Sequence, residues 1–264
     1  ARDGRSLSRA HRSSGVIRVV VAARPTTRAS AGMRAYTRAI LERVPRVAPD
    51  VEIVPVLSPL LVHPLALRLA RAQLVHLPYL EAAPLVPRPY VAMVHDLIHL
   101  RQPALFSRAT AAYWSIVATP LYRGAARVLV SDERVADDCV RLIGVDRARI
   151  RVVPLGYLDA VVDAEPWRAE RPYAFYAGNH RPHKGLETLC GAWAALPEDL
   201  ALDLVLTGPE EPALRSEYVR DRGRMTFLGE LDDAALARRY RGACVYVQPS
   251  LADGFGIPIL EAAV

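Results

Sequence analysis

Two loops in the second half of the chain hold the residues best suited to chemistry. The first spans Gln248–Glu261, between an apolar strand-like segment and a helix-like one. Gly254 and Gly256 let the backbone approach a ligand closely, and Pro258 stands where the first helical residue is expected. The N–H groups at the start of a helix favour an anion. The carboxylates of Asp253 and Glu261 instead suit the hydroxyls of a sugar or a ribose. The alternative is a glycine-rich turn whose acidic residues only complement the helix dipole.

The second loop spans Tyr176–Gly185 and also joins a strand-like segment to a helix-like one. It contains Arg181, His183 and Lys184, and Lys184 is the only lysine among 34 basic residues. Fixed cations stabilise the negative charge that develops on a departing diphosphate, without a metal ion. The alternative for this loop is a solvated basic segment.

Both loops depend on an alternation of short apolar strands with helical patterns, which begins at Val16. Strands that are apolar on both faces and alternate with helices are typical of a parallel sheet covered on both sides. In such sheets the strand-to-helix loops lie at one edge, where ligands bind. In the first half, strands are expected at 17–23, 51–57, 73–77, 90–94, 127–130 and 150–154, and helices at 33–43, 109–123 and 135–143.

The alternation stops in a polar, proline-containing stretch and then starts again. The second half has expected strands at 173–177, 202–206, 225–228 and 244–248, and expected helices at 186–196, 212–222, 233–241 and from 258 onward. We therefore expect an α/β protein with two tandem, Rossmann-like, doubly wound domains that face each other across a cleft, the second one incomplete. The expected boundaries are 1–15 for a disordered basic leader, 16–158 for the first domain, 159–172 for a linker and 173–264 for the second domain.

Charge is distributed unevenly along the chain. The net charge is +6, but residues 1–46 hold eleven arginines against Asp3 and Glu42, so the remaining residues sum to −3. This distribution argues against a uniformly basic nucleic-acid binder. Arg34, Arg38 and Glu42 are spaced four residues apart and should share one exposed helix face. A solvated face explains them, and the functional alternative is contact with an anionic membrane that carries a lipid-linked acceptor.

The cysteines and the apolar runs indicate a reducing compartment and no membrane span. Cys139, Cys190 and Cys244 form neither a CxxC pair nor a disulfide framework, and we expect all three to be buried in the core. No apolar run of the sequence is long enough to cross a bilayer, and Arg18 interrupts the only stretch that resembles a signal peptide. Because the sequence lacks a starting methionine and stops within an apolar pattern, we expect a fragment of a longer protein.

The residues of both loops resemble glycosyltransferase family 4, the retaining GT-B enzymes that use nucleotide sugars. The stronger matches are 176–184, Thr207-Gly208, Phe227-Leu228-Gly229, 233–240 and 249–261, and the weaker ones are Ala31-Gly32, His95-Asp96, 131–133 and 152–156. The resemblance therefore extends over nearly the whole chain. The combination of motifs is specific, although single motifs are not.

The resemblance implies roles for individual residues. The family's two-glutamate motif has the spacing from Asp253 to Glu261, so Asp253 is expected to contact the donor sugar and Glu261 the ribose. Asp253 replaces the usual glutamate and is one methylene shorter. Lys184 matches the lysine that binds the diphosphate. Asn179 stands where the family usually has a companion arginine, for which Arg181 is a candidate substitute.

The first half supplies the remaining implied positions. His95 matches a histidine near the reacting sugar, and Gly32 matches a loop close to donor and acceptor. The implied catalytic residues are His95, Asp253 and Lys184. The implied donor-binding residues are Asn179, Arg181, Lys184, Gly208, Leu228, Ser250, Gly254, Phe255, Gly256 and Glu261, and the implied acceptor-side residues are Ala31, Gly32 and Asp96.

The segment from His95 to His99 suggests a rival function, because it has the histidine spacing of the H-E-x-x-H zinc proteases. That motif needs one helix that carries both histidines and a third ligand elsewhere. Here a strand leads into the segment, Pro103 follows it, and Asp96 is too short for the glutamate base. We therefore expect no metal site and place His99 in a loop. The absence of a D-x-D motif also argues against a metal-dependent GT-A transferase.

The resulting prediction is a bacterial hexosyltransferase of polysaccharide or glycolipid biosynthesis that retains configuration and needs no cofactor. The donor is a nucleotide diphosphate sugar, with mannose as the candidate sugar, and the acceptor is a saccharide or a lipid-linked hydroxyl. The expected location is the cytoplasm, with contact to the inner face of the membrane as the extension of this prediction. The alternative is a nucleotide-sugar-binding fragment without catalysis, and the base, the acceptor and the oligomeric state stay open.

Overall fold

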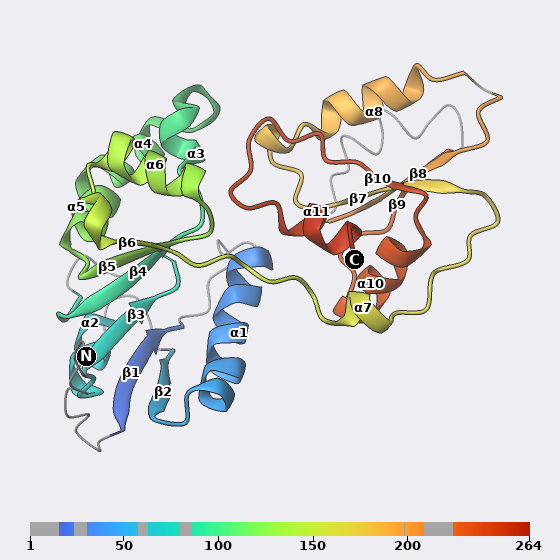
Figure 1. Cartoon of the computed structure of the whole chain (residues 1–264). Helices are drawn as coiled ribbons and strands as arrows, with labels where there is room; N and C mark the ends of the chain where they lie inside the picture. Colours follow the sequence, from blue (N-terminus) through green and yellow to red (C-terminus); the bar gives the residue numbers. More distant parts are fainter. Residues whose placement is uncertain (1–15, 24–30, 58–62, 80–85, 198, 209–223) are drawn as a thin grey trace, which may run out of the picture. The chain divides into compact units, whose positions relative to one another are not determined.

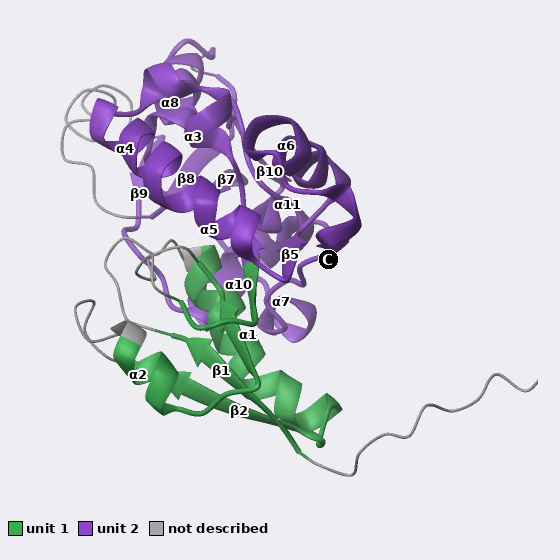
Figure 2. Cartoon of the chain, turned by 90° about the vertical axis from the view of Figure 1, so that its left-hand side faces the viewer, with its two compact units in different colours: residues 1–92 green, residues 93–264 purple. Residues whose placement is uncertain are grey.

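The computed structural model describes residues 16–23, 31–57, 63–79, 86–197, 199–208 and 224–264. The expected basic leader, 1–15, and the helix expected at 212–222 lie outside the described residues. The chain divides into two compact units, residues 1–92 and residues 93–264, which Figure 2 shows in green and purple.

Within the described residues, a first sheet has six strands in the order β2-β1-β3-β4-β5-β6 (Figure 1). These strands are β1 (Ile17–Ala22), β2 (Val51–Val56), β3 (Leu74–Leu77), β4 (Tyr90–Val94), β5 (Arg127–Val130) and β6 (Ile150–Val152). The strand order reverses at β1, which pairs in parallel with β2 on one side and with β3 on the other. This order is that of a doubly wound sheet, and all six expected strands are present with ends that differ by at most two residues.

The second sheet has four described strands in the order β10-β7-β8-β9. They are β7 (Tyr173–Ala177), β8 (Asp203–Thr207), β9 (Met225–Phe227) and β10 (Val245–Tyr246), and each pairs in parallel with its neighbour. Every residue of β7 is buried. A strand that is buried on both faces reads as a continuous apolar run, which is how the sequence Tyr-Ala-Phe-Tyr-Ala is built.

The two faces of the second sheet are covered by different helices (Figure 1). The helix α8 (Leu186–Ala194) covers the face to which Tyr176 points, through Leu189 and Trp193. The opposite face, to which Phe175 points, is covered by α7 (Ala160–Asp163), α10 (Asp233–Gly242) and α11 (Ile257–Ala262). Alternate residues of β7 thus belong to two separate hydrophobic clusters, as the two-residue period of a strand requires.

The helices of the first half include segments that the sequence did not predict. The described helices are α1 (Ala31–Val47), α2 (His63–Leu69), α3 (Ile98–Arg101), α4 (Arg108–Tyr113), α5 (Thr119–Gly124) and α6 (Glu133–Ile143), with short helical turns η1 (Pro103–Leu105) and η3 (Arg147–Arg149). The single helix expected at 109–123 is wrong in detail, because a π-helical turn, η2 (Trp114–Ala118), separates α4 from α5. Pro120 explains the turn, since its ring would clash with the carbonyl group of Ile116 in a regular α-helix.

The stretch 159–172 is packed rather than extended, although its composition is that of a linker. It contains α7, and Val161 of this helix is fully buried against the second sheet. The backbone N–H of Trp167 donates to the carbonyl oxygen of Arg238 at 2.9 Å. The Arg239 guanidinium lies 3.8 Å from the centroid of the Trp167 indole ring. One tryptophan and one valine therefore attach this polar segment to α10.

The cysteines differ from the expectation that all three are buried. Cys139 and Cys190 are buried, and burial raises the pKa of each thiol, to about 12 and about 11 respectively. Cys244 is exposed, because it lies just before the two-residue edge strand β10 rather than inside it.

Candidate functional site

The loop between β7 and α8 presents Lys184 through a series of backbone contacts. The Tyr176 hydroxyl donates to the carbonyl oxygen of Asn179 at 2.7 Å, and the Arg181 N–H donates to Oδ1 of Asn179 at 3.3 Å. The chain then turns through the 3₁₀ helix η4 (Pro182–Lys184), where the Lys184 N–H donates to the carbonyl oxygen of Arg181 at 2.8 Å. Gly185 has φ +68°, a left-handed conformation that glycine adopts without strain.

The loop between β10 and α11 lies directly against the first loop. The Leu251 N–H donates to the carbonyl oxygen of His183 at 2.9 Å. A Cβ atom at Gly185 would collide with the carbonyl oxygen of Pro249, so the two loops touch at backbone distance. His183 itself is buried. Its pKa is lowered mainly by this burial and, to a smaller extent, by the positive charge of Lys184. Two segments about seventy residues apart in the sequence thus form one surface, as expected for loops at the carboxyl ends of adjacent parallel strands.

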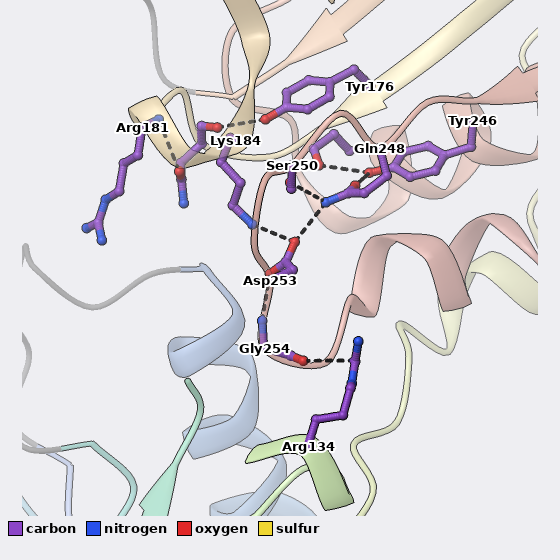
Figure 3. Close-up of polar contacts among 11 residues, drawn as sticks. Arg134, Tyr176, Arg181, Lys184, Tyr246, Gln248, Ser250, Asp253 and Gly254 are labelled. Carbon is purple, nitrogen blue, oxygen red and sulfur yellow. Dashed lines mark hydrogen bonds and ion pairs between the residues drawn. The ribbon is translucent and has the colours of Figure 1, made fainter. Parts of the chain in front are cut away.

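Lys184 and Asp253 form an ion pair at the centre of this surface (Figure 3). The distance from Nζ of Lys184 to Oδ2 of Asp253 is 2.7 Å, and the side chains are only 13% and 28% exposed. The Gly254 N–H donates to the other carboxylate oxygen at 3.2 Å. The residue predicted to bind a diphosphate and the residue predicted to bind a sugar therefore touch each other, and their low exposure makes the attraction stronger than in a surface pair.

Gln248 is a further partner of Asp253 that the sequence analysis did not single out. Its Nε2 donates to Oδ2 of Asp253 at 2.7 Å and to Oγ of Ser250 at 2.8 Å. The Tyr246 hydroxyl donates to Oε1 of Gln248 at 2.5 Å. The sequence did contain a signal for the contact of Tyr246 with Gln248, since the two residues are two apart within the strand expected at 244–248 and would share one face of it.

The two candidate cations differ in position. Arg181 is exposed, and Figure 3 shows its side chain directed away from Asp253. At the position of the family's usual arginine, Asn179 uses its side chain to accept a hydrogen bond from the loop backbone. Lys184 is consequently the one residue of this pair that contacts the candidate sugar-binding carboxylate.

Glu261 lies on α11 in a different environment from Asp253. It is 8% exposed, and its Oε1 accepts a hydrogen bond from the Leu158 N–H at 3.3 Å. Burial raises the pKa of Glu261 above its ordinary value, while the Tyr240 hydroxyl and the Leu158 N–H act in the opposite direction. The two acids of the motif thus have separate partners.

The turn between these acids differs slightly from the expected helix start. Gly256 precedes α11 with φ +82°, and Pro258 is the second residue of the helix rather than the first. Phe255, beside it, is partly buried. Only six residues form α11, so the helix dipole at its start is smaller than that of a long helix.

Gly208 and Leu228 lie at the ends of the neighbouring strands β8 and β9. The Gly208 N–H donates to the carbonyl oxygen of Gly229 at 3.0 Å, and the Leu228 N–H donates to that of Leu206 at 2.9 Å. Gly208 has φ +145°, and a Cβ atom there would collide with the carbonyl oxygen of Gly178. These contacts bring three strand ends together beside the Lys184 loop, which fits a close approach of backbone to a ligand.

His95 and Asp96 follow β4 and belong to the same unit as Asp253. A Cβ atom at Gly254 would collide with the carbonyl oxygen of His95, so the two backbones touch. Oδ1 of Asp96 accepts a hydrogen bond from the Ile98 N–H at 3.2 Å, at the start of α3. Asp96 therefore makes a local structural contact at the start of α3.

Arg134 is a second residue that the sequence analysis did not single out. It lies in the first turn of α6, and its Nη2 is 3.4 Å from the carbonyl oxygen of Gly254 (Figure 3). The Asp132 carboxylate accepts from the Val135 N–H at 3.0 Å and so caps this helix. The Arg134 side chain is 74% exposed, so this contact is a weak one.

The structure is inconsistent with a zinc-protease helix at His95–His99. The helix α3 begins only at Ile98, so one helix does not carry both histidines. His99 lies in α3 and not in a loop, and its ring is 4.2 Å from that of Phe106 and 5.2 Å from that of Trp114, measured between centroids. Burial lowers the pKa of His99, against a smaller opposite effect of Asp96. Among the described residues, no group of three or more histidine, cysteine or acidic side chains is arranged to hold a metal ion.

The acceptor-side residues Ala31 and Gly32 are the first residues of α1 in unit 1. Arg34, Arg38 and Glu42 of this helix are all exposed, which confirms the expected exposed face. In the parts of the chain that the structure describes, no helix is both long enough and apolar enough to cross a membrane.

The sequence matches two family models that follow each other along the chain. Residues 5–157 match the model described as Glycosyltransferase Family 4, and residues 171–264 match the model described as Glycosyl transferases group 1. The two matches together extend over both sheets.

Curated proteins with similar sequences include two mannosyltransferases. The chain is 33% identical over 150 residues to a phosphatidyl-myo-inositol mannosyltransferase of Mycolicibacterium smegmatis, covering 52% of this chain and 36% of that protein. It is 35% identical over 97 residues to the O-antigen chain mannosyltransferase B of Escherichia coli, covering 34% of this chain and 26% of that protein. The matched parts thus span between about a quarter and just over a third of the length of these relatives.

Solved structures with the same fold cover most of the chain. A sucrose-phosphate synthase from Thermosynechococcus elongatus has a TM-score of 0.72 at 19% identity, over 93% of this chain and 78% of that one. The Anabaena protein HepE, in complex with UDP and glucose, has a TM-score of 0.63 at 17% identity over the same shares. At this identity the likeness concerns the fold alone. Because one family model by itself covers more than half of the sequence, and the two sheets agree with it, the chain belongs to glycosyltransferase family 4 and has the GT-B fold.

Proposed function

We propose that the protein transfers a hexose from a nucleotide diphosphate sugar to an acceptor hydroxyl, with retention of configuration and without a metal ion. The observation that carries this proposal is the ion pair between Lys184 and Asp253, 2.7 Å apart at the joined carboxyl ends of β7 and β10. It places a cation for the diphosphate beside a carboxylate for the sugar. The names of the mannosyltransferase relatives support a hexose, with mannose as the first candidate. The complex of HepE with UDP and glucose supports a nucleotide-sugar donor.

In the proposed reaction, the bond between the sugar and the diphosphate breaks as the acceptor oxygen attacks from the same face. The departing phosphate oxygen accepts the proton of the acceptor hydroxyl, so no separate base is required. Lys184 stabilises the negative charge that develops on the diphosphate, which is where a fixed cation lowers the barrier most. Asp253 holds a sugar hydroxyl, Glu261 the ribose, and His95 lies on the reactive side of the sugar.

We extend the proposal to the other predicted positions. The donor contacts are Asn179, Arg181, Lys184, Gly208, Leu228, Ser250, Gly254, Phe255, Gly256 and Glu261, and the acceptor side is formed by Ala31, Gly32 and Asp96. The proposed domains are 16–158 and 173–264, with 159–172 between them. We place the protein in the cytoplasm, in a pathway that builds a polysaccharide or a glycolipid.

The experiment is a panel of UDP- and GDP-sugars incubated with the chain and with simple saccharide acceptors, in the presence and absence of EDTA. We expect release of nucleoside diphosphate from one donor, unchanged by EDTA, and a product whose anomeric proton has the configuration of the donor by NMR. An inverted product would contradict retention, and loss of turnover in EDTA would contradict metal independence. Saturable binding of a nucleotide sugar without nucleotide release would instead support the second candidate, a nucleotide-sugar-binding module without catalysis.

Contact with an anionic membrane is a separate part of the proposal. The exposed Arg34 and Arg38 on one face of α1 support it, since basic residues near a membrane are attracted to anionic lipid. The protein should be retained by liposomes that contain anionic lipid at low salt and released as salt increases. Equal recovery with neutral and anionic liposomes would contradict the proposed membrane contact and would leave the proposed transfer reaction unaffected.

A further inference from the structure

Asp253 is held by three donors that come from three places in the chain. Oδ2 accepts from Nζ of Lys184 and from Nε2 of Gln248, each at 2.7 Å, and Oδ1 accepts from the Gly254 N–H at 3.2 Å. Lys184 comes from the other loop, and Gly254 is the next residue in the chain. Gln248, two residues after the end of β10, is therefore the one side chain of its own loop that contacts the carboxylate (Figure 3).

The chemistry of the partners fixes the orientation of the Gln248 amide. An ionised carboxylate only accepts hydrogen bonds, so the amide must turn its NH₂ group toward Asp253. Its oxygen then faces the Tyr246 hydroxyl, 2.5 Å away. The single proton of this hydroxyl has a second acceptor in the carbonyl oxygen of Ala177, at 3.2 Å, and the shorter distance favours donation to Gln248. Burial raises the pKa of the Tyr246 hydroxyl, so this group keeps its proton over the whole physiological range. The Ser250 hydroxyl accepts from the same NH₂ group at 2.8 Å.

We propose that Gln248, oriented by Tyr246, is a positioning residue that holds Asp253 and, through it, Lys184 in the arrangement that the transfer reaction uses. This inference rests on the proposed function. An ammonium group has three protons, so Lys184 can keep Asp253 as a partner and still direct protons at a diphosphate. Because aspartate is short, it reaches Lys184 only from a narrow range of side-chain orientations, and the Gln248 amide selects one of them. Preorganisation of this kind removes a reorganisation cost from the reaction.

The kinetic test compares Gln248→Leu, which keeps the approximate volume but cannot donate, with wild type and with the same change in an Asp253→Asn background. We expect about a tenfold loss of kcat with a smaller change in KM from Gln248→Leu alone, and almost no further loss in the Asp253→Asn background. Equal losses in both backgrounds would show that Gln248 does not act through Asp253. Gln73→Leu, at an exposed glutamine of unit 1, is the matched control and should leave kcat unchanged.

A second measurement is independent of turnover. Lys184 is the only lysine, so protein labelled with ¹⁵N-lysine has one side-chain ammonium signal, and that signal reports on the ion pair. We expect Gln248→Leu to move this signal in the same direction as Asp253→Asn, by a smaller amount. An unmoved signal in Gln248→Leu, with a moved one in Asp253→Asn, would overturn the inference.

Two controls keep the test decisive. If Gln248→Leu does not fold, Tyr246→Phe removes a single hydroxyl and should produce the same change at about a third of the size. A lysine signal that responds as expected in a chain that turns over no nucleotide sugar would contradict the proposed function and leave the positioning role of Gln248 standing.

Discussion

The loop that carries Asp253 and the helix that carries Glu261 give two carboxylates of one motif opposite environments. Asp253 is partly exposed and has a counter-ion at 2.7 Å, whereas Glu261 is 8% exposed and accepts from a neutral backbone N–H. One carboxylate therefore faces a cation, and the other is kept in an apolar setting at a cost to its charged form. Two acids that belong to one sequence motif thus lie in different surroundings, Asp253 beside a cation and Glu261 in a buried position.

The largest expected effect comes from removing the support of the Asp253 loop. In Gly185→Ala, the new Cβ atom would meet the Pro249 carbonyl oxygen at a residue with φ +68°, so both loops must shift. We expect the free energy of unfolding to fall by about 3 kcal/mol and turnover to become undetectable. Gly191→Ala is the matched control, because nothing lies within 4 Å of its Cβ position in α8, and it should stabilise the protein by up to about 1 kcal/mol. Urea denaturation measures both variants.

Removing the charge of Lys184 is the next largest perturbation. Lys184→Ala should lower kcat by about a hundredfold or more, since one stabiliser of a developing charge is lost. Lys184→Arg keeps the charge and should recover part of this loss, although its planar group cannot reproduce the ammonium geometry. Wild-type kcat in Lys184→Ala, measured by nucleotide release, would contradict the role proposed for this residue.

Neutralising each carboxylate in turn tests the comparison directly. Asp253→Asn leaves the Lys184 ammonium, 13% exposed, without its counter-ion, and should lower the free energy of unfolding by about 1–2 kcal/mol at pH 7. Glu261→Gln should act in the opposite direction, because the folded-state pKa of Glu261 is raised by burial. A carboxyl pKa that is higher in the folded state lowers the free energy of unfolding once the pH exceeds the pKa of glutamate in the unfolded chain, near 4.3. The stability gained by Glu261→Gln should therefore grow above that pH and vanish below it.

Denaturation curves at several pH values between 3 and 8 measure these differences. The comparison fails if both variants destabilise the protein by the same amount at pH 7, because the two carboxylates would then have equivalent environments. Nucleotide affinity is the second readout, and Glu261→Gln should weaken it even where the protein is more stable.

The smallest effect is expected at an exposed ion pair of similar length. Arg147 and Glu133 are 2.6 Å apart, but their side chains are 48% and 67% exposed. Arg147→Ala should change the free energy of unfolding by less than about 0.5 kcal/mol. A loss as large as that of Asp253→Asn would mean that burial does not distinguish the two pairs.

Much of this arrangement could be predicted because it follows from strand order. Lys184 and Asp253 both follow parallel strands of the second sheet, and loops at the carboxyl ends of such strands meet at one edge. Their direct contact is not dictated by topology, since it depends on the side-chain orientations that the Gln248 amide and the Gly254 N–H select. An alternation of apolar and helical segments carries no information about such contacts.

The packing of residues 159–172 and the helical position of His99 could not be predicted, because the local sequence of each segment is compatible with more than one structure. The stretch 159–172 is polar on average, but single residues such as Val161 and Trp167 decide whether it packs. His99 was expected in a loop, yet the helix α3 begins one residue before it and its ring stacks on that of Trp114. In both cases a tertiary contact, which composition does not report, determined the local structure.

The buried strand β7 has a consequence for how the site can move. It lies between β8 and β10, and every one of its residues is shielded from solvent, so its amide hydrogens should exchange with deuterium only when the whole sheet opens. The loop with Lys184 follows this strand directly. Its amides donate within the loop itself, as those of Arg181, Lys184 and Gly185 do, so local opening should expose them to exchange earlier than the amides of β7. The loop of residues 178–185 is thus expected to open more readily than the strand to which it is attached, so that a change in its conformation would leave its point of attachment fixed.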